Sequence, residues 1–210
     1  RILIYLGASL KCRRERSEGM AIARRVLRRC MAAEHGAEVA VGCALMFHCI
    51  LRTGELFLFE AQHLGFSSCG SRASLSLPIT KSANKRGGGS ETVEIYDQRI
   101  VARLTSLVKD KLPGDKLFSM SMSYFRVQLL RVKSFFSLDD LHIQAYSLRR
   151  GGATHYFRSS GSLDRTILRG RWPSAKSARI YIEDGVAQLS AIALSDDQLL
   201  LVSRCKKFAA

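Results

Sequence analysis

The sequence has no long apolar segment and little negative charge. Its longest apolar run, residues 37–51, is 15 residues long and still contains Glu38 and His48. A membrane-spanning helix needs about 20 apolar residues, so we expect no membrane span. Only 18 residues are acidic against 33 Lys and Arg, which gives a net charge of +15 and an isoelectric point near 10.0. This excess favours a polyanionic partner, with nucleic acid ahead of an anionic membrane surface.

Cysteine motifs for metal binding are also missing. The chain has six cysteines, but no two of them are separated by two residues, and none stands at metal-ligand spacing from the five histidines. No secretory signal is readable, and a chain of 210 residues can bury a core without disulfide support. We therefore expect reduced thiols, mostly buried as small apolar side chains, at Cys12, Cys30, Cys43, Cys49, Cys69 and Cys205.

The remaining composition, 47% hydrophobic and 24% charged, is that of a globular protein. Apolar residues at three- to four-residue spacing predict helices, and alternating or β-branched stretches predict strands. The expected strands cover 73–80 and 91–96, joined by the Gly-rich hairpin connection KSANKRGGGS. The expected helices cover 18–34, 37–51, 97–109 (capped by Asp97), 121–136, 147–160 and 189–204, with two short ones capped by Ser162 and Ser174. The predicted fold class is mainly α with a small antiparallel β-hairpin or sheet (α+β).

The predicted helix 18–34 carries a basic face that includes Arg24 and Arg28. Residues 1–35 hold nine basic residues against three acidic ones. Two interpretations remain open for this face. It is either an ordinary solvated helix surface or a surface that contacts DNA.

Three short segments combine unusual residue types. Arg52 follows the apolar helix 37–51 and stands three positions before Glu55, which by itself indicates only an exposed helix end with a local ion pair. The segment YSLRRGGATH, residues 146–155, holds two adjacent glycines that would let another backbone approach closely. The segment RGRW, residues 169–172, is followed by ARIYIE.

In this order the segments resemble the catalytic domain of the tyrosine recombinases, the phage-integrase family. LRTGEL resembles the family's first arginine box, YSLRRGGATH its His-x-x-Arg box, RGRW the box that holds a His or Trp, and ARIYIE the segment around the nucleophilic tyrosine. The separations also fit, since Arg149 lies 23 positions before Trp172, which lies nine before Tyr181. Lys81 falls where the family carries a lysine on a β-hairpin. The similarity covers about residues 20–185.

The resemblance implies attack on a phosphodiester by Tyr181, with no metal and no other cofactor. A tyrosine hydroxyl can attack phosphorus and later leave, which keeps the bond energy in a phosphotyrosine link. Its ordinary pKa is about 10, so nearby cations must favour the phenolate. The non-bridging oxygens of the transition state suit two guanidiniums, here Arg52 and Arg149, because each offers paired N–H donors.

Three further residues complete the implied site. Lys81 would be the general acid for the departing 5′-oxygen, with Lys85 as a second candidate. Trp172 would donate its indole N–H to a phosphate oxygen, and Glu55 would orient the arginine pair from behind. The family's histidine in the second box is Tyr146 here, and a phenol with a pKa near 10 is a poor proton acceptor at neutral pH. Either this branch has adapted to the substitution or the copy is decayed.

The resemblance also implies a wider organisation. Residues 1–17 are expected to be a linker or the remnant of a missing N-terminal core-binding domain, residues 18–188 the integrase-like catalytic domain, and residues 189–210 a C-terminal helix and tail that docks on a neighbour. The implied partners are double-stranded DNA and further copies in a homo-tetramer on paired DNA sites. The implied location is intracellular with the DNA, in the nucleus if the host is eukaryotic. The residues expected to contact DNA are Arg24, Arg28, Lys85, Arg86, Arg150 and Arg171.

The predicted function is that of a site-specific DNA recombinase or integrase that cleaves and rejoins strands through a 3′-phosphotyrosine intermediate. Two alternatives stay open. A type IB topoisomerase shares the nucleophile, but it would relax supercoils as a monomer and its chain is normally longer. A non-catalytic DNA-binding remnant of an integrase would keep the basic groove without cleaving.

Overall fold

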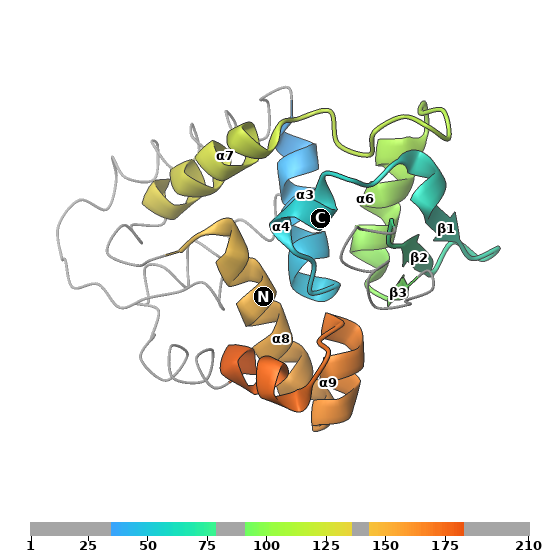
Figure 1. The fold of residues 1–210 in the computed structure, drawn as a ribbon. Coiled ribbons are helices and arrows are strands. Elements are labelled where there is room, and N and C mark those ends of the chain that lie inside the picture. The colour runs from blue at the N-terminus through green and yellow to red at the C-terminus, as the bar shows by residue number, and fades with distance from the viewer. Residues whose placement is uncertain (1–34, 79–90, 136–142, 183–210) are drawn as a thin grey trace, which may run out of the picture.

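The computed structural model describes residues 35–78, 91–135 and 143–182, which form helices around one small sheet (Figure 1). The helices are α3 (Gly36–His48), α4 (Thr53–Leu56), α6 (Gln98–Val108), α7 (Met122–Phe135), α8 (Ala145–Ser160) and α9 (Leu163–Gly170), with one 3-10 turn, η1 (Ala61–His63). The strands are β1 (Leu64–Phe66), β2 (Ala73–Ser76) and β3 (Thr92–Ile95). A last helical stretch covers residues 175–182. In these described ranges no helix is long and apolar enough to cross a membrane.

Three predicted segments lie outside the described residues. They are the helices 18–34 and 189–204 and the hairpin connection 81–90. The mainly helical fold class with a small antiparallel sheet is confirmed.

The sheet is antiparallel in the order β1–β2–β3. β2 pairs with β3 with Leu75 opposite Val93, which confirms the two expected strands, each shorter than its predicted range. Both side chains point into the core while the residues beside them are more exposed, as alternation requires. No sequence pattern indicates β1, because its three residues have a glycine at the centre and show no alternation.

Helix α3 lies at the centre of the fold, with α8 packed against it (Figure 1). Leu45 and Met46 of α3 are completely buried, as expected of a helix that is apolar nearly all round. The two helices approach each other at Gly152, where a Cβ atom would lie 2.0 Å from the carbonyl oxygen of Phe47. The close backbone approach predicted from the glycine pair is therefore confirmed.

The predicted caps are present at three helix starts. The side chain of Asp97 accepts a hydrogen bond from the backbone N–H of Arg99 at 3.0 Å and so caps α6. Ser162 caps α9 in the same way, and Ser174 caps the helical stretch 175–182, each through a bond of 3.3 Å. These caps satisfy N–H groups that the first turn of a helix leaves without a partner.

The predicted helix 37–51 is wrong at its C-terminal end. Helix α3 ends at His48, and Ile50 has a φ of 52°, a left-handed conformation that a right-handed helix cannot contain. Arg52 then begins the separate four-residue helix α4 as its N-cap residue. A short connection between two helices therefore positions the first predicted site residue.

Candidate active site

Arg52 is held at the start of α4 with 47% of its side chain exposed. Glu55 accepts a hydrogen bond from the backbone N–H of Arg52 at 2.8 Å and another from its Nη1 at 2.6 Å. An acidic residue at the third helical position reaches back to the N-cap in this way, which explains the three-residue spacing. The carboxylate fixes one edge of the Arg52 guanidinium and leaves the rest open to solvent.

Arg149, on α8, is completely buried. Its Nη1 donates to the carbonyl of Ile50 at 2.5 Å and its Nη2 to the carbonyl of Gly170 at 2.8 Å. Its Cζ lies 5.0 Å from the ring centre of Trp172, a cation–π contact. Burial lowers the pKa of Arg149 to about 10, yet the guanidinium remains charged at neutral pH.

Tyr146 and Tyr181 meet through their hydroxyls. The Tyr146 hydroxyl donates a hydrogen bond to the Tyr181 hydroxyl, and the ring centres are 5.8 Å apart. Burial, followed by this bond, raises the pKa of Tyr146 to about 12. Burial also opposes ionisation of Tyr181, but the bond from Tyr146 and the charges of Arg149 and Arg52 outweigh it and hold its pKa below 10. Tyr181 is therefore the phenol that ionises first.

Trp172 is buried between Gly170 and Tyr181. A Cβ atom at Gly170 would lie 1.8 Å from the Trp172 ring, so only glycine leaves room for the indole there. The ring centres of Trp172 and Tyr181 are 4.9 Å apart. The indole N–H is near enough to favour the Tyr181 phenolate, but it does not reach hydrogen-bond geometry.

Two buried side-chain donors have no hydrogen-bond partner among the described residues: the Nε of Arg149 and the Nε1 of Trp172. A buried donor without an acceptor costs about 1–3 kcal/mol. Both belong to the site predicted from sequence, and an anionic oxygen placed beside them would supply the missing acceptor.

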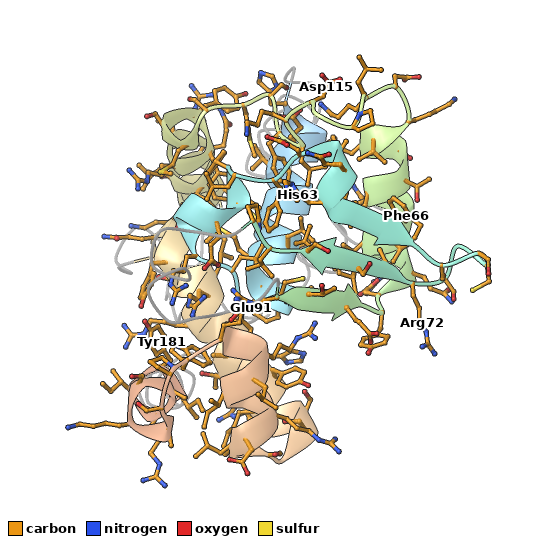
Figure 2. The ribbon with its side chains drawn as sticks, turned by 45° about the vertical axis from the view of Figure 1, so that its right-hand side comes forward. His63, Phe66, Arg72, Glu91, Asp115 and Tyr181 are labelled. Atoms are coloured by element: carbon orange, nitrogen blue, oxygen red, sulfur yellow. The ribbon has the colours of Figure 1, made fainter. Side chains whose placement is uncertain are left out.

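A surface cavity of about 790 Å³ brings the site together. Its lining residues come from α4, α8 and the segment 172–181, and they are Arg52, Tyr146, Arg150, Trp172, Pro173, Ser177, Ile180 and Tyr181. Arg149 is buried behind this wall, against Trp172. Figure 2 shows Tyr181 on the far side of the molecule from the sheet end that bears Phe66 and Arg72. A phenol of lowered pKa beside two guanidiniums is chemically suited to attack on an anionic ester.

No protein-family model and no curated protein matches the sequence. Among solved structures, the XerH site-specific recombinase bound to palindromic difH substrate, in a post-cleavage complex, is similar with a TM-score of 0.62 and 16% identity. The XerA recombinase is similar with a TM-score of 0.57 and 14% identity. This chain has the fold of a tyrosine recombinase catalytic domain. The resemblance predicted from the sequence is confirmed at the level of the fold.

The tyrosine recombinase fold extends over most of this chain but only part of its relatives. The match covers 88% of this chain and 52% of the XerH chain. For XerA it covers 94% of this chain and 66% of the other. The chain thus spans about half the length of XerH.

Several predicted recombinase residues are not placed by the structure. Lys81 and Lys85, the two candidates for the general acid, lie outside the described residues. Lys85 is also one of the residues expected to contact DNA, and three more of these lie outside the described residues: Arg24, Arg28 and Arg86. Their roles stay predictions. Of the other two expected DNA contacts, Arg150 lines the cavity.

Arg171 is not where a DNA contact would be expected. Its side chain is only 5% exposed, and its Nη2 lies 2.9 Å from a carboxylate oxygen of Glu55. The burial follows from the backbone, because Arg171 ends α9 with a φ of 57° and turns its side chain toward the end of α3. It therefore belongs to the interior of the recombinase fold.

Sequence reasoning missed the network that closes the C-terminal end of α3. Arg169 donates to the carbonyl of His48 at 2.9 Å, Arg171 to that of Cys49 at 3.1 Å, and Arg149 to that of Ile50. Cations suit the carbonyl end of a helix, so the RGR run was the available signal. Arg169 and its acceptor His48, at the end of α3, are 121 positions apart in the chain, so no local pattern indicates that they are in contact. Within the described ranges, no group of three His, Cys, Asp or Glu side chains is placed to hold a metal ion.

Proposed function

We propose that this chain is the catalytic domain of a DNA strand-breaking and rejoining enzyme that forms a 3′-phosphotyrosine at Tyr181. The observation that carries the proposal is the pair of unpartnered buried donors, Arg149 Nε and Trp172 Nε1, beside a phenol whose pKa lies below 10. Donors held without an acceptor are typical of a site organised for a developing anion. The tyrosine recombinase fold supports the same reading.

The proposed reaction exchanges one ester for another. The Tyr181 oxygen forms a bond to phosphorus, the bond from phosphorus to the 5′-oxygen breaks, and the 3′-phosphate stays on the protein. The phenol proton leaves to solvent, and Lys81 supplies a proton to the departing 5′-oxygen. The reverse attack by a 5′-hydroxyl rejoins a strand and frees Tyr181. This exchange of one phosphate ester for another requires no metal and no nucleotide cofactor.

In this proposal, different side chains bind the two non-bridging oxygens of the phosphate. Arg52, nearly half exposed at the cavity, binds one non-bridging oxygen through the donors that Glu55 leaves open. Arg149 Nε and the Trp172 indole N–H serve a second oxygen from the buried side. Tyr146 acts as a hydrogen-bond donor that stabilises the Tyr181 phenolate, and not as a base, because its own pKa is about 12.

The partner in this proposal is double-stranded DNA. Residues 141–181 hold eight basic residues against one acidic residue, and Arg150 lines the cavity. By analogy with the fold, we propose a homo-tetramer on paired sites, with residues 189–210 docking on a neighbouring copy and a core-binding domain outside residues 18–188.

The experiment is a covalent-trapping assay. Duplexes bound by the full chain are first selected from a random pool, because the target sequence is unknown. They are then nicked close to the bound centre, so that cleavage releases a short fragment and prevents rejoining. The expected result is a protein–DNA band that survives denaturation.

Each outcome points to one function. Denaturation-resistant adduct at selected sites, with no relaxation of supercoiled plasmid by the monomer, supports the recombinase. Relaxation by the monomer indicates a type IB topoisomerase. Selective binding without any adduct overturns the catalytic proposal and leaves a DNA-binding remnant of an integrase.

A further inference from the structure

Two residues with unusual backbone conformations contact each other beneath the site. Among the described residues, the non-glycine positions with positive φ are Ile50, at 52°, and Arg171, at 57°. The left-handed conformation costs roughly 1–2 kcal/mol for an ordinary residue and is a clear outlier for a β-branched one. Arg171 Nη2 donates to the Ile50 carbonyl at 3.2 Å, so the two strained residues are joined directly. Strain of this kind persists only where the surrounding contacts enforce it.

The guanidinium of Arg171 is surrounded by oxygen acceptors from five residues. Nη1 donates to the carbonyls of Cys49 at 3.1 Å and Arg169 at 3.0 Å, and Nη2 donates to Glu55 Oε2 at 2.9 Å as well as to Ile50. Nε lies 3.5 Å from a carboxylate oxygen of Glu91.

These acceptors are the groups that fix both predicted phosphate-binding arginines. Glu55 Oε2 receives Arg171 and the backbone N–H of Arg52, while Oε1 receives the Arg52 side chain. The Ile50 carbonyl receives Arg171 and Arg149. One buried guanidinium thus touches the anchor of Arg52 and the anchor of Arg149 at the same time.

The charges lead to the same conclusion. Glu55 lies 2.6 Å from Arg52, 2.9 Å from Arg171 and 3.9 Å from Arg149. Without Arg171, the negative charge of Glu55 would be compensated only by Arg52 and Arg149, the two arginines that are proposed to bind phosphate. With Arg171 present, that charge is compensated from the buried side, and Arg52 and Arg149 keep their attraction for an anion.

We propose that Arg171 is a positioning residue: its buried guanidinium holds Ile50 and Glu55 so that Arg52 and Arg149 are placed and charged to bind the scissile phosphate. It does not contact DNA itself. This inference rests on the proposed function for its catalytic consequence, but not for its structural one. The position it occupies, the C-terminal cap of α9, is one that glycine ordinarily fills, so the strain is tolerated because of the contacts the side chain makes.

The catalytic test compares two variants on two substrates. Arg171→Gly removes the contacts and relieves the strain, and Arg169→Ala is the matched control, because Arg169 caps the neighbouring His48 carbonyl without touching Glu55 or Ile50. One substrate has an ordinary scissile phosphate and the other a methylphosphonate, which is neutral and needs no guanidinium clamp. We expect Arg171→Gly to slow adduct formation about 10²-fold on phosphate, the cost of a misplaced clamp, with DNA affinity unchanged.

On methylphosphonate, Arg171→Gly should slow adduct formation only a few-fold. Any slowing caused by Arg169→Ala should be equal on both substrates. Arg171→Lys, which keeps the charge with fewer directed donors, should restore part of the rate. Equal Arg171→Gly defects on the two substrates would show a general loss of structure and would overturn the inference.

A second readout does not depend on cleavage. Trp172 is the single tryptophan of the chain and lies against Arg149, so its fluorescence reports the placement of that guanidinium. We expect Arg171→Gly to raise acrylamide quenching of Trp172 at least twofold while Arg169→Ala leaves it unchanged. If the parent forms no adduct, the proposed function fails and this comparison still decides the inference. Equal quenching in parent and Arg171→Gly contradicts it.

Discussion

The Tyr146 hydroxyl donates a hydrogen bond to the Tyr181 hydroxyl, 35 residues along the chain. Burial, followed by this bond, raises the pKa of Tyr146 to about 12. Burial also opposes ionisation of Tyr181, but the same bond and the neighbouring arginines hold its pKa below 10. The residue that replaces the expected histidine is thus built into the site as a donor. This contact favours an adapted pocket over a decayed position, if Tyr181 is the nucleophile as proposed.

Removing that donor should slow cleavage in a pH-dependent manner. In Tyr146→Phe the pKa of Tyr181 rises, so at neutral pH a smaller fraction is phenolate. A hydrogen bond to a charged group contributes at least about 1.5 kcal/mol, which corresponds to roughly a tenfold slower single-turnover cleavage. The defect should diminish as pH rises toward the pKa of Tyr181, because the phenolate then forms without help.

The control for this prediction is Tyr96→Phe. Tyr96 follows β3, is exposed beneath Arg72, and is not among the residues that line the site cavity. Its variant should keep the parental pH–rate profile. A Tyr146→Phe enzyme that is equally slow at every pH would contradict the donor role.

Restoring the family's histidine should bring no benefit. The Tyr146 phenol spans a ring separation of 5.8 Å to reach Tyr181 with its hydroxyl, and the smaller imidazole of Tyr146→His would fall short. We expect a cleavage rate equal to or below that of the parent, with DNA affinity little changed. A gain above about tenfold, the scale of a positioned acid–base group, would indicate a damaged enzyme and not an adapted pocket.

The contact between α3 and α8 gives a stability prediction with a built-in control. In Gly152→Ala the new Cβ would lie 2.0 Å from the Phe47 carbonyl oxygen, so two backbones must separate. We expect the free energy of unfolding to fall by about 3 kcal/mol, the upper end of the usual cost of overpacking, because the obstacle is backbone. Gly151→Ala places its Cβ 3.4 Å from a Phe47 ring atom, an ordinary contact. It should be neutral or stabilising by up to about 1 kcal/mol, as measured by urea denaturation. Equal destabilisation by both variants would contradict the packing described here.

DNA affinity should depend steeply on salt. Each contacted phosphate contributes a slope of about −0.9 to log affinity against log salt. Arg150→Ala should reduce the slope by about one such unit, because Arg150 lines the cavity. Arg99→Ala removes the same charge from α6, where Arg99 pairs with Asp97 at 2.8 Å, and should leave the slope unchanged. A parental slope near zero would mean that the basic residues are only solvated.

Local chemistry was readable from the sequence where partners lie close together in the chain. The spacing from Arg52 to Glu55 predicts their ion pair, which the structure confirms. The sequence places this pair at the end of helix 37–51, whereas in the structure Arg52 is the N-cap of α4 and Glu55 reaches back to it. Asp97, Ser162 and Ser174 predict helix starts because a side-chain oxygen at the N-cap accepts a hydrogen bond from a backbone N–H of the first turn. The order of the boxes then predicts the fold, which the similarity to XerH and XerA confirms.

Long-range pairing was not readable. Ile50 has a positive φ against its own preference, because Arg149 and Arg171 hold its carbonyl from 99 and 121 residues away. Charge alone suggests that Arg171 is a surface residue. Its burial depends on contacts with residues about 120 positions away, such as Ile50, so it could not be predicted from the local sequence. Tertiary contacts override local preference at both positions.

The central claim, that Tyr181 is the nucleophile, is tested most directly by mapping the DNA-linked residue in the trapped adduct. Digestion with trypsin and nuclease, followed by mass spectrometry, should locate a nucleotide phosphate on the Tyr181 peptide. Tyr181→Phe removes only the phenol oxygen, so it should form no adduct while its DNA affinity stays within about threefold of the parent. An adduct that persists in Tyr181→Phe, or that maps to another tyrosine, would contradict the account.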